Sequence, residues 1–333
     1  MKRIFKKDFD YMPETYYYPE EKDLIKMKFH NYQLDINNLW LVKPINGRNG
    51  GNISFFKSLN KIILKEFVIS KYIANISLIK GKKYDLRLYV LVSSLKPLKI
   101  YLYKEGLVRI ATELYYLNKS YLENRFIHLT NVAINKFSKH FIKPTKSNDE
   151  NSSTWNIFMY KKFLRNNRIK WNKMKEDIKD IIIKSIISVY QNLTEENEQK
   201  NLDDKNFYNM LGFDILINNK FKPILLEINR RPSMIYLNNL DKKIKINLMT
   251  DTLNLVGIVP FSRKSKIPLY FTNKYNLLNS NIKNSFCELN RVKGDYELIF
   301  PTKTNINKYN KYFIYNTREN KLFWSKIKSV IKE

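Results

Sequence analysis

Three oxygen-bearing side chains, Asp214, Glu227 and Asn229, lie on two apolar stretches separated by a short polar turn. If these stretches form a hairpin that pairs Ile217 with Ile224, Asp214 falls opposite Glu227. Because side chains alternate between the faces of a strand, Asn229 shares the face of Glu227. Carboxylate and amide oxygens, completed by water and phosphate oxygens, are the ligands that a nucleotide-bound Mg²⁺ takes. A solvated or lysine-paired cross-strand Asp and Glu is the more ordinary interpretation of this spacing, so a metal site needs support from elsewhere in the chain.

A lysine at a strand end gives that support. The strand predicted at 39–43 ends at Lys43 and runs directly into a loop containing Gly47, Gly50 and Gly51. Such an arrangement can bring an ammonium and backbone N–H groups to phosphate oxygens. The loop matches neither a Walker A motif nor a dinucleotide fingerprint. Each feature alone is ordinary, and their combination favours a nucleotide site.

The longest alternating segment begins at Lys83 and predicts a strand with one buried and one polar face. The apolar face carries Tyr84, Leu86, Leu88, Val90 and Val92, and the polar face Lys83, Asp85, Arg87 and Tyr89. After a turn at 95–97, a strand at 98–103 and a short third strand beyond Gly106 predict an antiparallel meander. Arg109 would then lie on a sheet face.

Other segments predict the elements that support this sheet. Residues 171–190 have apolar side chains at helical spacing and predict a core-facing helix. Residues 143–154 and 194–206 are polar and predict loops. Residues 1–38 contain two prolines that interrupt any long helix and predict an irregular lead-in.

The composition indicates a globular protein with an anionic partner. The chain has 333 residues, 44% of them hydrophobic and 14% aromatic, which is enough for a sizeable core. Its formal charge of +29 would attract nucleic acid, an anionic membrane or an acidic protein. Part of the positive charge could instead reflect a general abundance of Lys, which occurs together with abundant Asn and Ile in proteins encoded by AT-rich DNA. The sequence contains no compact basic cluster of the nucleic-acid-binding type.

Cysteine use and hydropathy favour a cytosolic protein. The single cysteine, Cys287, excludes a disulfide within the chain and favours a reducing compartment. The first residues lack the apolar core of a signal peptide, and the longest apolar run, 181–189, is interrupted by Lys184. We therefore expect neither secretion nor a membrane span.

An ordered series of motifs resembles the tubulin tyrosine ligase-like family, and the resemblance covers most of the chain. The motifs are Trp40-Leu41-Val42-Lys43-Pro44, Lys71-Tyr72-Ile73, Lys83-Tyr84-Asp85-Leu86-Arg87, Tyr103-Lys104-Glu105-Gly106-Leu107-Val108-Arg109, His128-Leu129-Thr130-Asn131, Gly212-Phe213-Asp214 and Leu226-Glu227-Ile228-Asn229. The resemblance implies an α+β fold of the ATP-grasp type, in which two lobes with mostly antiparallel sheets close over ATP. It also implies a ligase that activates a carboxylate as an acyl phosphate before an amine attacks it.

The same resemblance implies a division of the chain. Residues 1–38 would be a lead-in or the remnant of an N-terminal lobe, because the family normally has a longer segment before Trp40. Residues 39–80 would form the central lobe, residues 81–260 the C-terminal lobe with the metal site, and residues 261–333 a basic extension.

Site residues can be carried over by motif. The nucleotide-binding set is Lys43, Gly50, Ser70, Lys71, Tyr72, Ile73, Lys83, Asp85, Thr130 and Asn131, with the three lysines on the phosphate and purine sides and the backbone of Tyr72 and Ile73 at the adenine edge. The magnesium ligands would be Asp214, Glu227 and Asn229. The catalytic set is Arg87, Arg109 and Glu227, since guanidinium groups bind planar oxyanions well. The substrate set is Arg109, Asn135, Lys136 and Lys245.

Within the family, the segments 103–112, 128–136 and 229–233 are more similar to the polyglutamylating members than to tyrosine ligase itself. Free glutamate is therefore the expected donor, with glycine and tyrosine as alternatives, although Val132 and Ile224 depart from the residues usual in those members. The implied partner is tubulin, through its acidic C-terminal tails, and the implied location is the cytoplasmic microtubule cytoskeleton, including the axoneme or basal body. An inactive microtubule-binding pseudoenzyme and a nucleic-acid binder are the competing interpretations, and no recognition motif supports the second.

Overall fold

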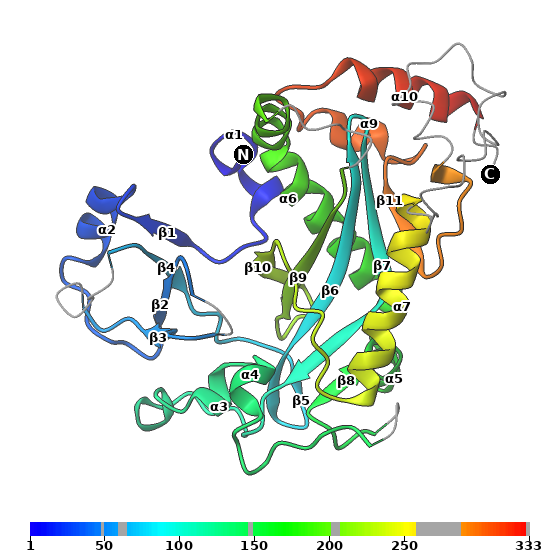
Figure 1. Cartoon of the computed structure of the whole chain (residues 1–333). Coiled ribbons are helices and arrows are strands. Elements are labelled where there is room, and N and C mark those ends of the chain that lie inside the picture. The colour runs from blue at the N-terminus through cyan, green and yellow to red at the C-terminus, as the bar shows by residue number, and fades with distance from the viewer. Residues whose placement is uncertain (48–49, 59–64, 146–148, 201–206, 258–287, 331–333) are drawn as a thin grey trace.

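Two antiparallel sheets carry the fold in the computed structural model, which describes residues 1–47, 50–58, 65–145, 149–200, 207–257 and 288–330 (Figure 1). Cys287 and residues 261–287 of the expected basic extension lie outside this part of the chain. The expected α+β class with mostly antiparallel sheets is confirmed. In the described residues, no helix is both long and apolar enough to cross a membrane.

The smaller, four-stranded sheet has the order β1-β4-β2-β3. It contains β1 (Thr15–Tyr18), β2 (Trp40–Pro44), β3 (Ser54–Phe55) and β4 (Phe67–Lys71). Helix α2 (Lys22–Phe29) buries Ile25 and Phe29 against this sheet, where Phe29 meets Trp40 edge-on at 5.0 Å. Such aromatic contacts can stabilise a small core that has few aliphatic residues.

The expected strand at 39–43 is confirmed within one residue as β2. The prediction that residues 1–38 form an irregular lead-in is wrong in part. Residues 1–38 also form α1 (Lys2–Phe5), the short 3-10 helix η1 (Lys6–Phe9), β1 and α2. The prolines lie between these short elements, so they bound regular structure and do not exclude it. Because β1 pairs with β4, residues from both sides of the expected boundary at 38 share one sheet, and the domain division stays a prediction.

The larger, seven-stranded sheet has the order β10-β9-β6-β7-β11. Its long central strands are β6 (Lys82–Leu95) and β7 (Leu98–Ile110), flanked by β9 (Asn209–Ile217), β10 (Pro223–Asn229) and β11 (Tyr296–Phe300). The short strands β5 (Leu78–Ile79) and β8 (Thr154–Asn156) pair with β6 and β7. The hairpin of β6 and β7 thus lies in the middle of the large sheet.

The two strands expected at 98–103 and beyond Gly106 form one strand, β7, and this prediction of a break was wrong. The register passes from Leu88 opposite Gly106 to Val90 opposite Leu102, so β7 bulges between Leu102 and Gly106 and continues. A Cβ atom at Gly106 would lie 2.7 Å from the carbonyl oxygen of Arg87. The glycine therefore permits the close approach of two strands at a bulge instead of marking a turn.

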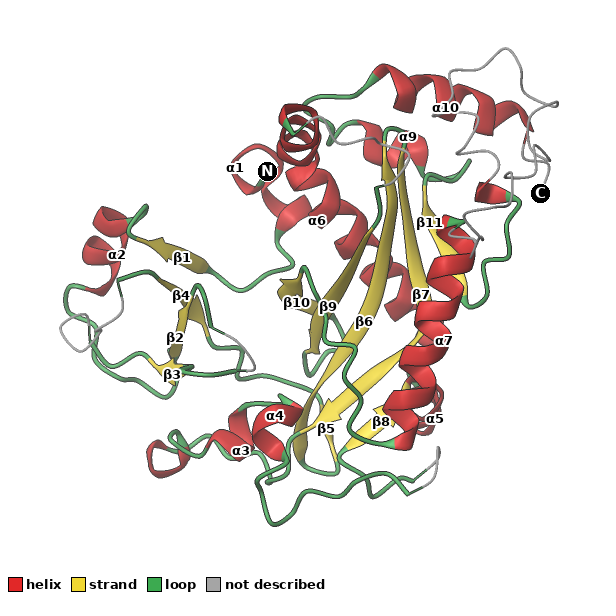
Figure 2. Ribbon diagram, in the orientation of Figure 1, coloured by secondary structure: helices red, strands yellow, loops and turns green. Residues whose placement is uncertain are grey.

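One face of the large sheet is buried by helices, as the alternation of β6 predicts. The residues expected on the apolar face of β6 lie in the main core with helices α5 (Ile157–Asn166), α6 (Trp171–Gln199), α9 (Ile306–Asn310) and α10 (Arg318–Val330). The opposite face is polar only in its first half. Tyr89 and Leu91 are buried there in a second core under α7 (Asn239–Val256), which lies across the front of the sheet in Figure 2.

The predicted helix at 171–190 is confirmed as α6 but extends to Gln199. The loop expected at 194–206 is therefore wrong for residues 194–199, and residues 201–206 lie outside the described chain. Glutamate and glutamine are good helix formers, so a polar composition here indicates a solvated helical face and not a loop. The loop expected at 143–154 is confirmed in its described residues as far as Ser153, and Thr154 begins β8.

Candidate functional site

The hairpin of β9 and β10 places Asp214 opposite Glu227, as predicted, but by a different register. At the turn, Ile217 faces Pro223 and Leu216 faces Ile224, one residue away from the expected pairing. A β-bulge between Leu225 and Glu227 then adds one residue to β10 and restores the Asp214–Glu227 pair. The alternation alone could not reveal this bulge, because it compensates an equal error at the turn.

A row of buried charges crosses three neighbouring strands at the polar end of the large sheet. Arg109 on β7 donates from Nε to Asp85 Oδ1 of β6 at 2.8 Å, and its Nη2 contacts Oδ2 of the same carboxylate. Arg109 Nη2 also lies 2.8 Å from Asp214 Oδ2 on β9. Arg87 on β6 donates to both oxygens of Asp214, at 2.5 Å from Nε and 3.0 Å from Nη2. The two guanidinium groups and two carboxylates therefore compensate one another's charge.

Strand register explains why these residues meet. Asp85 pairs directly with Arg109, and Arg87 pairs directly with Asp214. The stem of Arg87 also passes over Gly212, where a Cβ atom would lie 3.3 Å from its Cδ. A larger residue at 212 would crowd the path by which Arg87 reaches the next strand.

The three predicted metal ligands are neighbours. Asn229 Nδ2 lies 3.1 Å from Glu227 Oε1 and 3.5 Å from Asp214 Oδ2. Burial opposes ionisation of Asp214, but Arg109 and Arg87 outweigh it and hold the pKa of this carboxyl well below its usual range. The pKa of Glu227 is raised, because the walls of the cleft limit its hydration and Asp214 is a neighbouring negative charge.

This donor set fits Mg²⁺. Within the described part of the chain, Glu227 has no ammonium or guanidinium within 4.0 Å, so its charge beside Asp214 lacks a direct counterion. A divalent cation bound to both carboxylates would remove that repulsion, and hard oxygen donors suit Mg²⁺. The amide nitrogen of Asn229 faces the carboxylates, so coordination through its oxygen requires the amide to rotate by about 180°. No group of three or more His, Cys, Asp or Glu side chains that could hold a softer metal occurs in the described residues.

All residues predicted to bind the nucleotide line one cavity between the two sheets, with about 720 Å³ of empty space that is partly open to solvent. Arg109, Asp214 and Glu227 line the same cavity, so the metal and phosphate sites are adjacent. Lys43 and Ser70 come from the small sheet, whereas Lys83 and Asp85 come from the large one. The cavity also contains side chains not predicted from the sequence, namely Pro13, Leu41, Ile53, His128, Leu129, Leu216 and Leu226.

Lys43 and Lys83 contribute positive charge to the interior of this cavity. Burial lowers the pKa of Lys83 to about 8, with Asp85 opposing this shift and Lys43 adding to it. The pKa of Lys43 is also lowered by removal from water, against the attraction of Glu227 and Asp214. Neither ammonium has a carboxylate within 4.0 Å among the described residues, which leaves both available to an anionic ligand. Lys71 lies at the exposed rim.

The predicted substrate residues other than Arg109 do not line the cavity. Asn135 is fully buried, and its Oδ1 accepts hydrogen bonds from Thr112 N and Oγ1, both at 3.0 Å. Lys245 donates to Asp241 and, at 2.6 Å, to the carbonyl oxygen of Ile235, which ties the loop after β10 to α7. Lys136 is exposed at the end of α4 (Val132–Asn135). The first two make structural contacts here, and the substrate roles of all three stay predictions.

His128, at the end of α3 (Arg125–His128), is the polar cavity residue that sequence reasoning did not assign. It belongs to the His128-Leu129-Thr130-Asn131 motif, whose last two residues were assigned to the nucleotide. The sequence signal that could have assigned His128 to the cavity was its position, as a polar residue, inside this motif.

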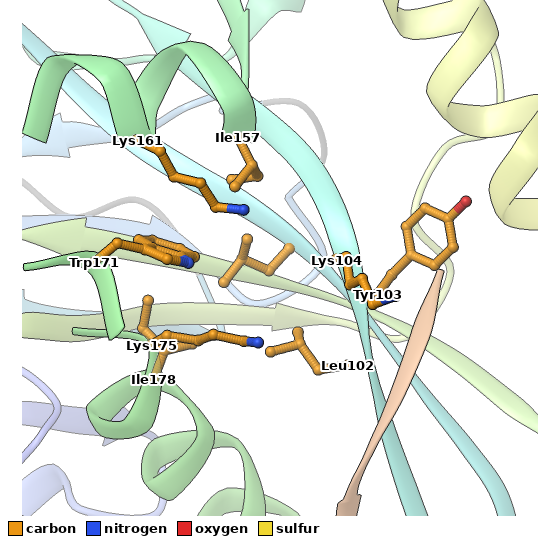
Figure 3. Close-up of a pocket in the computed structure, with 9 residues that line it drawn as sticks. Leu102, Tyr103, Lys104, Ile157, Lys161, Trp171, Lys175 and Ile178 are labelled. Carbon is orange, nitrogen blue, oxygen red and sulfur yellow. The ribbon is translucent and has the colours of Figure 1, made fainter. Parts of the chain in front are cut away.

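A second cavity lies on the helical side of the large sheet, where α5 and α6 meet β6 and β7 (Figure 3). Lys161 and Lys175 extend beside Trp171, as Figure 3 shows, and Lys161 Nζ lies 5.6 Å from the indole centroid. Lys175 pairs with Glu297 at 2.5 Å, and Lys104 with Asp295 at 3.7 Å. These carboxylates neutralise much of the positive charge, so we assign this cavity no ligand.

Comparison with known proteins agrees with this geometry. Tubulin polyglutamylase TTLL5 of Homo sapiens is 34% identical over 271 residues, which are 80% of this chain and 21% of the human protein. The probable alpha-tubulin polyglutamylase Ttll1 of Tetrahymena thermophila is 34% identical over 265 residues, 74% of this chain and 60% of that protein. Tubulin polyglutamylase TTLL7 of Homo sapiens is 33% identical over 263 residues, 75% and 29% of the two chains. The chain thus spans about a fifth to three fifths of the length of these relatives.

Residues 1–266 match the Tubulin-tyrosine ligase family. The match covers the small sheet and every strand of the large sheet except β11, and it includes every residue of the charged row and the nucleotide cavity. With the antiparallel α+β architecture and the cleft between its sheets, this chain belongs to the tubulin-tyrosine ligase family and has its ATP-grasp-like fold.

Proposed function

We propose that this chain is an ATP- and Mg²⁺-dependent ligase that adds glutamate to glutamate side chains in the acidic C-terminal tails of tubulin. Ligases of this family use ATP, and the relatives compared above are named tubulin polyglutamylases. The observation that carries the proposal is one cavity that combines two lysines without a carboxylate partner among the described residues, Lys43 and Lys83, with Arg109 and the carboxylates of Asp85, Asp214 and Glu227. Arg87 and Asn229 lie directly behind these carboxylates, in contact with Asp214 and Glu227.

The charges suggest how the chain would bind ATP. Lys43 and Lys83 are poised to bind phosphate oxygens, and the apolar side chains of Leu41, Ile53 and Leu216 provide a surface for the base. Asp214, Glu227 and Asn229 would hold Mg²⁺, which neutralises charge on the phosphates when bound. The family match supports this assignment of roles.

Arg109 is suited to stabilise the transferred group. Its guanidinium lines the cavity while Asp85 fixes its Nε and Nη2 atoms, so its orientation is set before any ligand binds. A preorganised cation can stabilise charge that develops on a phosphoryl or acyl phosphate group. Aminolysis of the acyl phosphate would form the amide bond, release inorganic phosphate and transfer a proton from the amine to a base. Glu227, with its raised pKa, and Asp85 are the candidate proton acceptors.

The net charge of +29 suits an acidic protein partner. We therefore propose an association with microtubules in the cytoplasm, with axonemes and basal bodies as candidate locations. Binding to tubulin tails should weaken steeply when the salt concentration rises from 50 to about 300 mM, because exposed charges are screened within about 10 Å at 0.1 M salt. Salt-insensitive co-sedimentation with microtubules would contradict this electrostatic proposal.

The deciding experiment measures incorporation of radiolabelled glutamate into purified microtubules, with and without Mg-ATP, with glycine and tyrosine in parallel. ATP-dependent labelling with glutamate that disappears when the tubulin tails are removed by limited proteolysis is the expected result. Labelling with glycine or tyrosine instead would change the donor. Binding to microtubules without labelling by any donor would identify the chain as a non-catalytic binding protein.

A further inference from the structure

His128 joins the two sides of the nucleotide cavity through hydrogen bonds. Its Nδ1 atom lies 3.0 Å from the hydroxyl of Tyr72, which directly follows β4 of the small sheet. The Lys83 Nζ atom, near the start of β6 in the large sheet, donates to the same hydroxyl at 3.4 Å. All three side chains are buried, with 4–7% of their surface exposed. The contacts therefore link a histidine, a tyrosine and a lysine across the cleft.

The direction of each hydrogen bond follows from the chemistry of the partners. His128 Nε2 lies 3.2 Å from the carbonyl oxygen of Tyr121, which can only accept, so Nε2 carries the hydrogen. Burial and the nearby charge of Lys83 lower the pKa of His128 to about 4, so the ring is neutral at pH 7 and Nδ1 has a free lone pair. Burial also raises the pKa of Tyr72 well above its usual value, which keeps its hydroxyl protonated. Tyr72 therefore donates to His128 and offers its own oxygen lone pairs to Lys83.

Aromatic contacts hold this arrangement in place. Phe55 of β3 packs edge-on against the ring of His128 at 5.1 Å, and Tyr115 does so at 6.0 Å. The ammonium of Lys83 also lies 4.6 Å from the centroid of the Tyr72 ring. Because a lysine side chain has several rotatable bonds, these contacts restrict where its ammonium can point.

We propose that His128 is a positioning residue that acts through the hydroxyl of Tyr72 to hold the ammonium of Lys83 toward the bound nucleotide. The hydrogen bonds run from Lys83 to Tyr72, from Tyr72 to His128, and from His128 to the carbonyl oxygen of Tyr121. This inference rests on the proposed function, since it takes Lys83 as a nucleotide contact. It assigns a role to a histidine that touches neither the metal cluster nor the charged row in the structure.

Two substitutions of His128 distinguish the roles of its two ring nitrogen atoms. His128→Gln retains an N–H donor near Nε2 but lacks an acceptor near Nδ1, whereas His128→Asn retains an acceptor near Nδ1. Tyr72→Phe removes the central hydroxyl with little change of volume. Tyr84→Phe is the matched control, because it removes a buried hydroxyl that bonds Ser77 and Tyr160 outside the nucleotide cavity.

The test measures the Kd of Mg-ATP by calorimetry, and KM for ATP and kcat by glutamate incorporation, for the whole chain. His128→Gln and Tyr72→Phe should each raise Kd and KM by about tenfold, which corresponds to one lost charge-assisted hydrogen bond, and should change kcat by less than about threefold. His128→Asn should stay within about threefold of the wild type in all three constants, and Tyr84→Phe should match the wild type.

The outcomes separate the inference from the proposed function. A wild-type protein that fails to bind Mg-ATP overturns the proposed function and, with it, the assignment of Lys83. A wild-type protein that binds, with unchanged Kd in Tyr72→Phe and His128→Gln, overturns the positioning role alone. If His128→Asn and His128→Gln raised the Kd of Mg-ATP equally, the positioning role would also be overturned, because the hydrogen-bond acceptor at Nδ1 would then have no effect on nucleotide binding.

Discussion

Replacement of Arg109 by methionine should destabilise the protein strongly, since two buried carboxylates share this cation. Arg109 is 6% exposed, and it contacts Asp85 through Nε and Nη2 and Asp214 through Nη2. In the variant, Asp214 retains both contacts with Arg87, but Asp85 loses its guanidinium partner. Removal of one partner from a buried pair costs about 3–5 kcal/mol, and we expect a value in this range for Arg109→Met. Arg109→Lys retains the charge without the planar fork and should cost about 1–3 kcal/mol.

Urea denaturation at pH 7.5, with the midpoint and the m-value fitted separately, measures these changes in the free energy of unfolding. The double variant Asp85→Asn/Arg109→Met completes a thermodynamic cycle, because it removes the stranded charge together with its partner. The loss in the double variant should be smaller than the sum of the single losses by about 1–3 kcal/mol. The charged row does not stabilise the fold as argued if the free energy of unfolding of Arg109→Met lies within about 1 kcal/mol of the wild-type value. The same conclusion follows if the coupling energy between Asp85 and Arg109 is zero.

Three further predictions concern the nucleotide cavity. Glu227→Gln should lower kcat by about 100-fold or more while the melting temperature and microtubule binding stay near the wild-type values; retained activity would remove Glu227 from the metal ligands. Because the pKa of Lys83 is about 8, KM for ATP should rise between pH 7 and pH 9 as the ammonium loses its proton, and Lys83→Met should show a high KM without this rise in steady-state assays. Burial lowers the pKa of His128 from its ordinary value of 6.5 to about 4, so protons bind preferentially to the unfolded chain and stability should fall as the pH decreases from 7 to 5. His128→Asn should reduce that slope in urea titrations at several pH values, and an unchanged slope would show that His128 is already solvated in the folded state.

Sequence reasoning grouped residues that the structure brings into one cavity more accurately than it placed the ends of the elements. The strand from Lys83 and the hairpin that carries Asp214 were predictable, because a period of two fixes which residues share a face. The continuity of β7 through Gly106 was not, since a glycine at a bulge and a glycine at a turn have the same local pattern. The extension of α6 beyond Tyr190 was missed because a solvated helical end and a loop have similar composition.

The contacts of individual side chains were less accessible from the sequence. Motif resemblance assigned Lys245 to the substrate, whereas the structure pairs it with Asp241 one helical turn away. It gave no role to His128, because its partners Tyr72 and Tyr121 lie 56 and 7 residues away along the chain. Such pairings depend on how the two sheets and their loops pack together, which no local periodicity contains.

The charged row also has a consequence for how the chain folds during its synthesis. Residues on β6 and β7 leave the ribosome close together, so Asp85 and Arg109, 24 residues apart, can pair early. The partner of Arg87, Asp214, is 127 residues away and follows the whole of α5 and α6. Contacts of such long separation form late because loop closure opposes them. Until β9 docks, the edge of β6 remains open with an uncompensated guanidinium, a charge that disfavours pairing with strands of other nascent chains.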